Sequence, residues 1–236
     1  MALPKIDKPL FEMAIPSQNR MVKFRPFLVK EEKILLMAQQ SGSEKEIVLA
    51  IKQILQNCVA DDKFDVDDLA TFDLEYMFVK LRARSVNNVI KLSYEDLEDQ
   101  KTYDFEVDLD DIDIIKNPEH TNKIKINDEV GIIMKYPSIT LIDSVPETDD
   151  PLVVVDHLIK SCIDKIYDAD NVYVAKEQPP EELREFIDNL DVQTYDKIRQ
   201  FFDTLPRMHY EIKYENSLGN ERVIELNKLS DFFTLG

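Results

Sequence analysis

The stretch that most constrains the fold of this chain is residues 24–38, which read Phe-Arg-Pro-Phe-Leu-Val-Lys-Glu-Glu-Lys-Ile-Leu-Leu-Met-Ala. Pro26 lacks a backbone N–H and disfavours helical angles at Arg25, so a strand that reaches this point must end there. A helix is predicted from about Val29, because two glutamates occupy its first turn, where the helix dipole favours anions. The expected inward face of that helix consists of Ile34, Leu35, Met37 and Ala38.

Two β-hairpins are predicted, one near each end of the chain. The first joins residues 11–15 to residues 21–27, and its second strand alternates between apolar and polar side chains. That alternation gives the strand one face toward the core and one face toward water. The second hairpin joins residues 208–214 to residues 222–226 through Asn216-Ser-Leu-Gly-Asn220.

The most regular helical pattern covers residues 43–58. It opens on Ser43-Glu-Lys-Glu46, which has the form of a capping box, and its apolar residues fall at helical spacing. Further helices are predicted over residues 72–84, from Pro151 through Ile166 with Asp150 as the N-cap and Val155 inward, from Pro179, and from Asp191 to Leu205. Short strands are predicted at residues 87–92, 103–109, 112–115, 123–126 and 130–136, with a polar loop over residues 93–102.

These patterns predict an α+β fold in three consecutive parts. Residues 1–86 form a helical N-terminal unit that begins with the first hairpin. Residues 87–149 form a central β-rich segment, which ends near the acidic stretch Glu147-Thr-Asp-Asp150. Residues 150–236 form a helical C-terminal unit that closes in the second hairpin.

The composition argues against several classes of function. The chain of 236 residues has four glycines, whereas phosphate-binding loops and dinucleotide-binding folds use glycine freely. A net charge of −18 disfavours binding to the phosphate backbone of nucleic acids. No apolar run approaches the roughly 20 residues of a membrane span, and no signal-peptide pattern is present, so we expect folding in a cytoplasm without membrane contact.

The charge is distributed unevenly along the chain. Residues 1–34 hold seven basic and four acidic side chains, a net charge of +3. Residues 95–113 hold ten acidic side chains and one lysine, a net charge of −9. Ordinary solvated surface explains both regions, and the alternative is that they meet within one molecule, between copies or with a partner.

No catalytic, cofactor-binding or metal-binding constellation is predicted. The acidic run from Asp108 to Glu119 has the length of a calcium-binding loop, but Ile112 occupies a ligand position and the glycine of the sharp turn is missing. The two cysteines, Cys58 and Cys162, lie on the apolar faces of predicted helices, so we expect buried free thiols.

Two places carry residue types that are enriched in protein interfaces, where arginine and aromatic side chains dominate. One is the turn after the first hairpin, together with the basic face of the helix that follows it. The other is the aromatic pair near the C-terminus. Filling the protein's own core is the alternative interpretation for the aromatic residues. The predicted partner contacts are Arg25, Phe27, Lys30, Lys33, Phe232 and Phe233.

Several stretches taken together resemble one protein family. They are Arg25-Pro-Phe-Leu-Val-Lys-Glu-Glu-Lys-Ile-Leu-Leu-Met-Ala38, Ile51-Lys-Gln-Ile-Leu-Gln-Asn-Cys58, Phe72-Asp-Leu-Glu-Tyr76, Leu81-Arg-Ala-Arg-Ser85, His120-Thr-Asn-Lys123, Gly131-Ile-Ile-Met-Lys-Tyr-Pro137 and Leu229-Ser-Asp-Phe-Phe233. They are similar, in this order, to the baseplate hub proteins of T-even-type contractile-tailed phages, a family that covers the hub subunit and the hub assembly catalyst.

The resemblance implies a non-enzymatic role in building the baseplate hub, through contacts with other hub or tail proteins. The implied location is the host cytoplasm during assembly, with the tail baseplate of the virion as a second location. Two other functions stay open. One is a chaperone for tail or tape-measure assembly that is absent from the virion. The other is a hub-associated peptidoglycan hydrolase, which would need paired carboxylates in a cleft.

The sequence departs from the family in the loops of two hairpins, where many relatives carry cysteine pairs that resemble small zinc ribbons. Here the loops read Tyr94-Glu-Asp-Leu-Glu-Asp-Gln-Lys101 and Glu215-Asn-Ser-Leu-Gly219, and neither contains cysteine. We therefore expect metal-free hairpins in which packing replaces the cross-link. Stoichiometric zinc in the purified protein would contradict this expectation.

Overall fold

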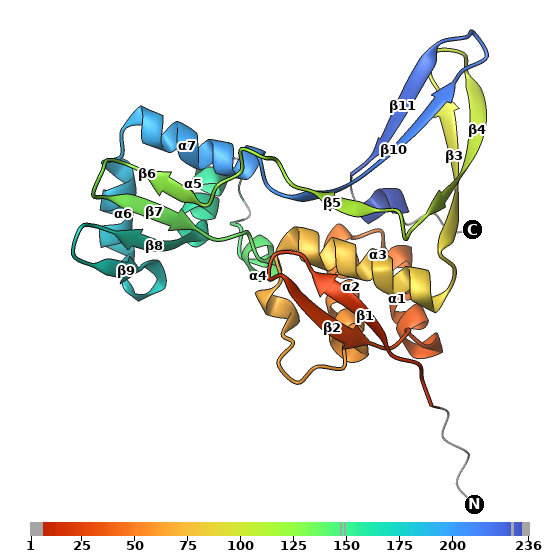
Figure 1. Cartoon of the computed structure of the whole chain (residues 1–236), viewed down its shortest axis with the longest axis horizontal. Helices are drawn as coiled ribbons and strands as arrows, with labels where there is room; N and C mark the ends of the chain where they lie inside the picture. Colours follow the sequence, from red (N-terminus) through yellow and green to blue (C-terminus); the bar gives the residue numbers. More distant parts are fainter. Residues whose placement is uncertain (1–6, 147, 149, 228, 233–236) are drawn as a thin grey trace, which may run out of the picture. The chain divides into compact units, whose positions relative to one another are not determined.

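The computed structural model describes residues 7–146, 148, 150–227 and 229–232. Within these residues the chain forms seven α-helices and eleven strands, and every strand pairing is antiparallel (Figure 1). The predicted α+β fold is confirmed. Among the described residues, no helix combines the length and the apolar character that a membrane span requires.

The chain divides into two compact units. Unit 1 consists of Met1–Ile115 together with Arg207–Gly236, and unit 2 consists of Lys116–Pro206. The expected parts 1–86, 87–149 and 150–236 do not coincide with this division. The physical reason is a long-range strand pairing, because β10 (Arg207–Glu215) pairs with β5 (Asp113–Ile115) and returns the C-terminal hairpin to the first unit.

Unit 1 begins with the predicted hairpin and three helices. Val22 and Phe24 are buried on the inner face of the hairpin, while the residues that alternate with them are exposed. Asp73 fixes the hairpin turn, because its carboxylate accepts hydrogen bonds from the backbone N–H (2.9 Å) and the hydroxyl of Ser17. The elements are β1 (Phe11–Ile15), β2 (Arg20–Phe24), α1 (Val29–Ser41), α2 (Glu44–Cys58), the 3-10 helix η1 (Val66–Asp68) and α3 (Thr71–Ser85).

The core of this part lies where α2 and α3 pack under the hairpin. Its largest fully buried side chains include Phe24, Ile51, Leu55, Met77 and Phe78. α1 ends at Gly42, whose φ of +68° is the left-handed conformation that glycine adopts most easily.

One inward residue of α1 was predicted wrongly. Met37 is 71% exposed, because the buried stripe of α1 runs through Glu31, Leu35 and Ala38 and therefore faces another direction.

The remaining strands of unit 1 form two further hairpins. β3 (Val89–Asp96) pairs with β4 (Lys101–Asp108), and β10 pairs with both β5 and β11 (Glu221–Leu226) in the order β11-β10-β5. β3 and β4 extend further toward their turn than predicted, so most of the expected loop over residues 93–102 is strand. The 3-10 helix η3 (Leu229–Phe232) follows the last strand.

Unit 2 is a four-stranded sheet covered by helices, in the strand order β6-β7-β8-β9 (Figure 1). Its buried cluster joins the sheet residues Ile132 and Met134 to Ile159 of α5, Ile187 of α6 and Phe201 of α7. The elements are β6 (Lys123–Lys125), β7 (Gly131–Met134), α4 (Ile139–Asp143), α5 (Pro151–Cys162), β8 (Ile163–Tyr167), β9 (Val172–Val174), the 3-10 helix η2 (Ala175–Glu177), α6 (Pro180–Asp188) and α7 (Val192–Asp203).

The predicted start of α5 is confirmed, since the Asp150 carboxylate accepts a hydrogen bond from the N–H of Leu152. Its predicted extension to Ile166 is wrong, because β8 begins at Ile163. β8 lies inside the sheet and pairs with strands on both sides, and this pairing outweighs a helical pattern that local sequence supports. Val155, predicted inward, is 37% exposed.

Candidate partner-binding surfaces

The turn before α1 is held by a buried ion pair. The Glu31 carboxylate is fully buried, and Arg25 Nη2 lies 2.9 Å from its Oε1. The backbone N–H of Leu28 donates to Oε2 of the same carboxylate at 2.9 Å, which satisfies one free donor at the helix start. The Arg25 guanidinium also donates to the carbonyl oxygens of Pro26 and Asn57, each at 3.0 Å.

Both members of this pair are charged. Burial alone would raise the pKa of the Glu31 carboxyl, but hydrogen bonds from Arg25, from the N–H of Leu28 and from Lys30 outweigh burial and lower that pKa. Burial opposes the charge of Arg25 as well, yet its pKa is raised by the carboxylate of Glu31. The pair therefore fixes the turn by electrostatics and hydrogen bonding together.

The structure places the predicted contact residues in different environments. Arg25 points inward to Glu31, and Phe27 is buried with its backbone N–H donating to Ser85 Oγ at 3.0 Å. Lys30 and Lys33 are exposed on α1. Lys30 Nζ also lies 3.2 Å from Glu31 Oε1. The side chain of Phe232 and the whole of Phe233 lie outside the described residues.

The outer side of α1 carries exposed apolar and basic side chains together. We call it the α1 surface, and it consists of Val29, Lys30, Lys33, Leu36 and Met37. These positions recur at helical spacing, so the side chains lie along one side of the helix. Local sequence reasoning selected the two lysines but missed the apolar members, because it directed Met37 toward the core.

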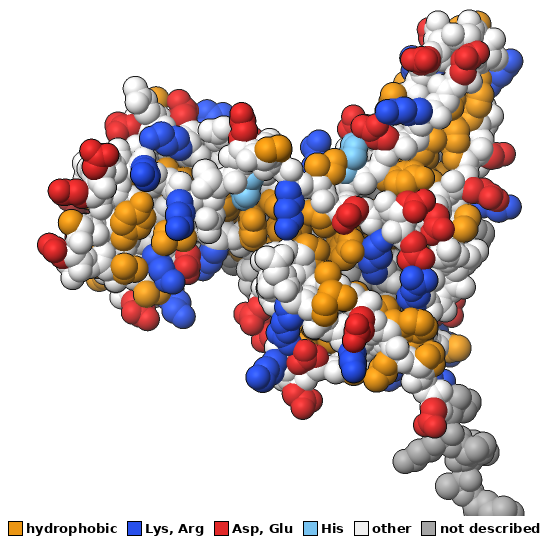
Figure 2. Space-filling model, in the orientation of Figure 1, with side chains coloured by type: hydrophobic (Ala, Val, Ile, Leu, Met, Phe, Trp, Pro, Cys, Tyr) orange, Lys and Arg blue, Asp and Glu red, His pale blue; other side chains and the backbone are white. Residues whose placement is uncertain are grey.

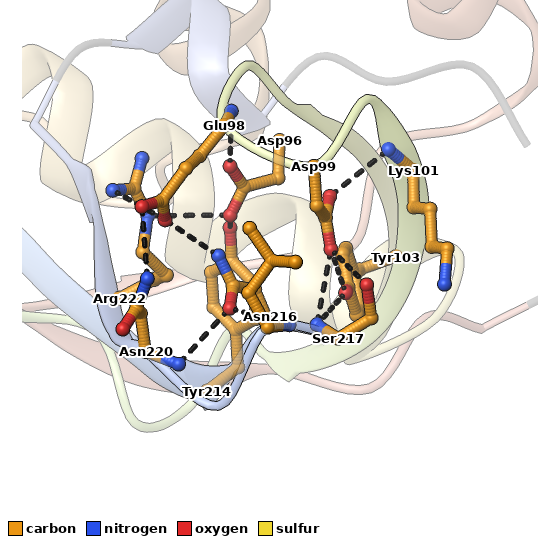
Figure 3. Close-up of polar contacts among 11 residues, drawn as sticks. Asp96, Glu98, Asp99, Lys101, Tyr103, Tyr214, Asn216, Ser217, Asn220 and Arg222 are labelled. Carbon is orange, nitrogen blue, oxygen red and sulfur yellow. Dashed lines mark hydrogen bonds and ion pairs between the residues drawn. The ribbon is translucent and has the colours of Figure 1, made fainter.

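A second candidate surface is formed where the tips of two hairpins meet. In Figure 3 side chains of the β3–β4 loop face those of the β10–β11 loop, which lies more than one hundred residues later in the chain. We call this arrangement the hairpin clamp. Its members are Asp96, Glu98, Asp99 and Tyr103 from the first hairpin and Tyr214, Asn216, Ser217, Asn220 and Arg222 from the second.

Asp96 is at the centre of the clamp and is fully buried. Its Oδ2 accepts a hydrogen bond from the Tyr214 hydroxyl at 2.6 Å and lies 3.2 Å from Nε of Arg222. The hydrogen bond from Tyr214, the N–H of Glu98 and the charge of Arg222 lower the pKa of Asp96 against the opposing effect of burial. Burial and the same carboxylate raise the pKa of Tyr214 to about 12, so the hydroxyl stays a donor.

Two more carboxylates bridge the loops. Glu98 accepts hydrogen bonds from the side-chain amides of Asn216 at 2.7 Å and Asn220 at 2.8 Å. Asp99 accepts from the backbone N–H and the hydroxyl of Ser217, at 3.0 Å and 2.8 Å, and from the Tyr103 hydroxyl at 2.5 Å. The two tips are therefore joined through side chains on both hairpins.

An aromatic cluster lies beside these polar contacts. The ring of Tyr214 lies 4.9 Å from that of Tyr103, 5.2 Å from that of Phe105 and 6.5 Å from that of Tyr94, measured between centroids. Aromatic pairs of this kind stabilise a fold beyond the effect of burying their apolar surface. Sequence reasoning missed the clamp because its partners are remote in the chain. The available signal was the alternation of Tyr103 and Phe105 on β4, opposite Tyr94 on β3.

A comparison with known protein families matches residues 8–234 to the family described as T4 bacteriophage base plate protein. The chain belongs to this family. It is therefore a structural or assembly protein of a phage baseplate, and its partners include other baseplate proteins. No curated protein and no solved structure matches the chain significantly.

The loops of this baseplate protein do not fit a zinc ribbon. Zinc ribbons need thiolate or imidazole ligands, whereas the clamp offers carboxylates, amides and hydroxyls that already bond to one another. Across the part of the chain that the structure describes, no group of three or more His, Cys, Asp or Glu side chains is placed to hold a metal ion. The metal-free state of the hairpins remains a prediction.

Unit 2 of the baseplate protein has a cleft of about 310 Å³ that is lined by two acidic residues, Asp168 and Glu182. Asp168 accepts hydrogen bonds from the N–H groups of Asp170 and Asn171 and from the Tyr173 hydroxyl. These bonds lower its pKa, which is the opposite of what a general acid needs. Asp168 therefore acts as the anchor of the β8–β9 turn.

Proposed function

We propose that this protein is a non-enzymatic component of the baseplate hub, either a hub subunit or a hub assembly factor, and that it acts through protein–protein contacts. The observation that carries the proposal is the α1 surface. It combines exposed apolar side chains with two lysines on a helix whose start is fixed by a buried ion pair.

The chemistry of the α1 surface suits a protein partner. Val29 and Met37 are 65% and 71% exposed, so both side chains offer apolar contact area to a partner. Lys30 and Lys33 add positive charge to an otherwise acidic chain, which favours association with acidic partner surfaces.

The chemistry of the cysteines supports a non-enzymatic role. Both are buried, and burial raises the pKa of Cys58 to about 11 and that of Cys162 to about 12. The thiol rather than the nucleophilic thiolate is the dominant form of both residues at neutral pH. They therefore act as apolar core residues, as the sequence predicts.

The proposal is tested by reversing the chemistry of the α1 surface with Lys33→Glu and Met37→Asp in one variant. Both residues are exposed, so the melting temperature should stay within about 2 °C of the wild type. When the variant is supplied in trans to a phage that lacks this gene, the yield of infectious particles should fall at least about tenfold, because interface hot spots contribute about 2 kcal/mol or more.

A matched control is Lys45→Glu with Leu49→Asp on α2, which has the same residue spacing, similar chemistry and exposed side chains. The proposal fails if the α1 variant supports wild-type particle yields, or if the control reduces them equally. Mass spectrometry of purified tails then separates the two roles, since a hub subunit is retained in the tail and an assembly factor is absent. An assembly factor should copurify with a hub protein from infected cells, whereas a tape-measure chaperone should copurify with the tape-measure protein.

A further inference from the structure

Each hairpin tip of the clamp carries one exposed leucine. Leu97 of the β3–β4 loop is 83% exposed and Leu218 of the β10–β11 loop is 61% exposed. Tight turns normally use glycine, asparagine, aspartate or serine, which have specific backbone or hydrogen-bonding roles there. A leucine contributes nothing of this kind to a turn, and at these two exposed tips its apolar side chain is available to a partner.

The clamp fixes the backbone next to both leucines. Leu97 lies between Asp96 and Glu98, whose carboxylates bind the second hairpin. Leu218 follows Ser217, which binds Asp99 of the first hairpin. The two leucines are therefore presented on loops that are ordered before any partner binds, which reduces the entropic cost of association.

The surface around the leucines is acidic. The two tip segments, residues 95–101 and 215–222, contain six acidic and two basic side chains, a net charge of −4. Arg222 is already paired with Asp96. Three exposed glutamates, Glu95, Glu215 and Glu221, lie outside the hydrogen-bond network of the clamp. At the free end of the hairpin pair, Figure 2 shows hydrophobic and acidic side chains beside one another.

We propose that the clamped tips form a docking element that inserts Leu97 and Leu218 into an apolar depression on another baseplate protein, and that basic residues surround this depression. The apolar side chains would supply the contact energy, while the acidic rim would select a basic surface and speed the encounter. The proposal rests on the geometry of the clamp and on family membership, and it does not depend on the role of the α1 surface.

The charge of the chain argues for a different protein as the occupant. A second copy carries a net charge of −18, so its approach to an acidic tip is opposed on average by repulsion. A partner with basic residues around its depression would be attracted to the tip rather than repelled. The experiment must still be able to detect a contact with a second copy, because that result would contradict the proposal.

The test is site-specific photo-cross-linking of the full chain during infection. The photoreactive amino acid p-benzoylphenylalanine replaces Leu97 in one variant and Val192, which is 76% exposed on unit 2, in a control. The expected result is a cross-link from position 97 to another baseplate protein, in a peptide with net positive charge, and at least about fivefold less of that product from position 192. A cross-link to a second copy, a cross-link to an acidic peptide, or equal products from both positions would overturn the proposal.

A charge variant tests the acidic rim separately. Glu95→Gln, Glu215→Gln and Glu221→Gln remove three negative charges without touching the clamp, so folding and amide protection of the hairpins should be unchanged. The yield of the cross-link from position 97 should fall at least about threefold. The control, Glu46→Gln with Glu181→Gln and Glu185→Gln, removes three exposed glutamates elsewhere and should leave the yield unchanged. Equal yields from the two charge variants would refute the electrostatic part of the proposal.

Discussion

Replacement of Glu31 by alanine should lower the free energy of unfolding by about 3–5 kcal/mol, the range observed when one partner of a buried ion pair is removed. The substitution leaves the Arg25 guanidinium, whose side chain is only 18% exposed, without its buried counter-charge. It also leaves the backbone N–H of Leu28 without its acceptor at the start of α1. Both losses are costly because the groups concerned cannot all reach water.

Urea unfolding followed by circular dichroism measures this effect. Glu32→Ala is the matched control, since Glu32 is the exposed neighbour in the same helical turn, and its replacement should change stability by less than about 0.5 kcal/mol. The free energy of unfolding of Glu31→Gln should lie between those of Glu31→Ala and Glu32→Ala. The glutamine amide oxygen can still accept a hydrogen bond from the N–H of Leu28, but it carries no charge. Similar stabilities for Glu31→Ala and Glu32→Ala would contradict the structural role of the ion pair.

The same ion pair predicts a direction of pH dependence. The pKa of Glu31 is lower in the folded protein than in the unfolded chain, so the ionised carboxylate stabilises the fold above its ordinary pKa of about 4.3. That contribution is lost as the pH falls through the lowered pKa of the folded state. The stability difference between the wild type and Glu31→Ala should therefore be full at neutral pH and shrink in acid.

The ion pair also changes how the basic face of the first helix is interpreted. From the sequence, Arg25, Lys30 and Lys33 form one basic group at the start of a helix. In the structure Arg25 is bonded to a buried carboxylate, and a charge reversal there would place two carboxylates together and destabilise the turn. For this reason the functional test alters two exposed members of the α1 surface, Lys33 and Met37, and leaves Arg25 intact.

Local sequence patterns predicted the elements whose residues interact mainly with near neighbours. The first hairpin follows from strict alternation and from Pro26, although its second strand ends at Phe24 rather than at the predicted residue 27. α2 follows from one continuous apolar stripe, and its N-cap Ser43 accepts a hydrogen bond from the N–H of Glu46. In these segments, burial, capping and backbone geometry favour the same structure.

The elements that sequence reasoning missed depend on distant partners. Ile163 and Ile166 fit a helical stripe, but β8 forms because β7 and β9 pair with it on both sides. The pairing of β10 with β5 joins segments about one hundred residues apart and decides which unit holds the C-terminal hairpin. A single sequence carries no local signal for either pairing.

The hairpin clamp is the clearest case of a structure that depends on residues distant in the sequence. The polar stretch at residues 93–102 has the composition of ordinary solvated surface, and Asp96 within it has no local feature that predicts burial. Its carboxylate is buried because Tyr214 and Arg222 cover it from a hairpin that begins far along the chain. The family resemblance distinguishes both loops from those of relatives, but it does not predict that Asp96 of one hairpin bonds to Tyr214 and Arg222 of the other.

Replacement of Asp96 by alanine should separate the two hairpin tips. The Tyr214 hydroxyl and the Arg222 guanidinium would lose their shared acceptor, and the bridges made by Glu98 and Asp99 would have to hold the loops alone. Hydrogen bonds to charged groups are among the stronger ones in proteins, so amide exchange at the tips of β10 and β11 should accelerate at least about tenfold. Exchange in α2, which lies outside the clamp, should stay unchanged.

Hydrogen exchange followed by mass spectrometry resolves these segments, and Glu106→Ala provides the control. Glu106 is exposed on β4, away from the clamp, and pairs with Lys91 at 3.6 Å, so its loss should leave the tips protected. The pKa of Asp96 is lowered in the folded state, so tip protection in the wild type should persist above its ordinary pKa of about 3.9 and fall as the pH drops through the lowered value.

Asp96→Ala also links the stability of the clamp to its proposed docking role. If ordered tips are needed to present Leu97, the substitution should reduce cross-linking from position 97 together with tip protection. Addition of EDTA to the wild type should change neither quantity, because the clamp is built from side-chain hydrogen bonds and ion pairs. Unchanged tip protection in Asp96→Ala would show instead that the aromatic cluster around Tyr214 holds the hairpins together without the buried carboxylate.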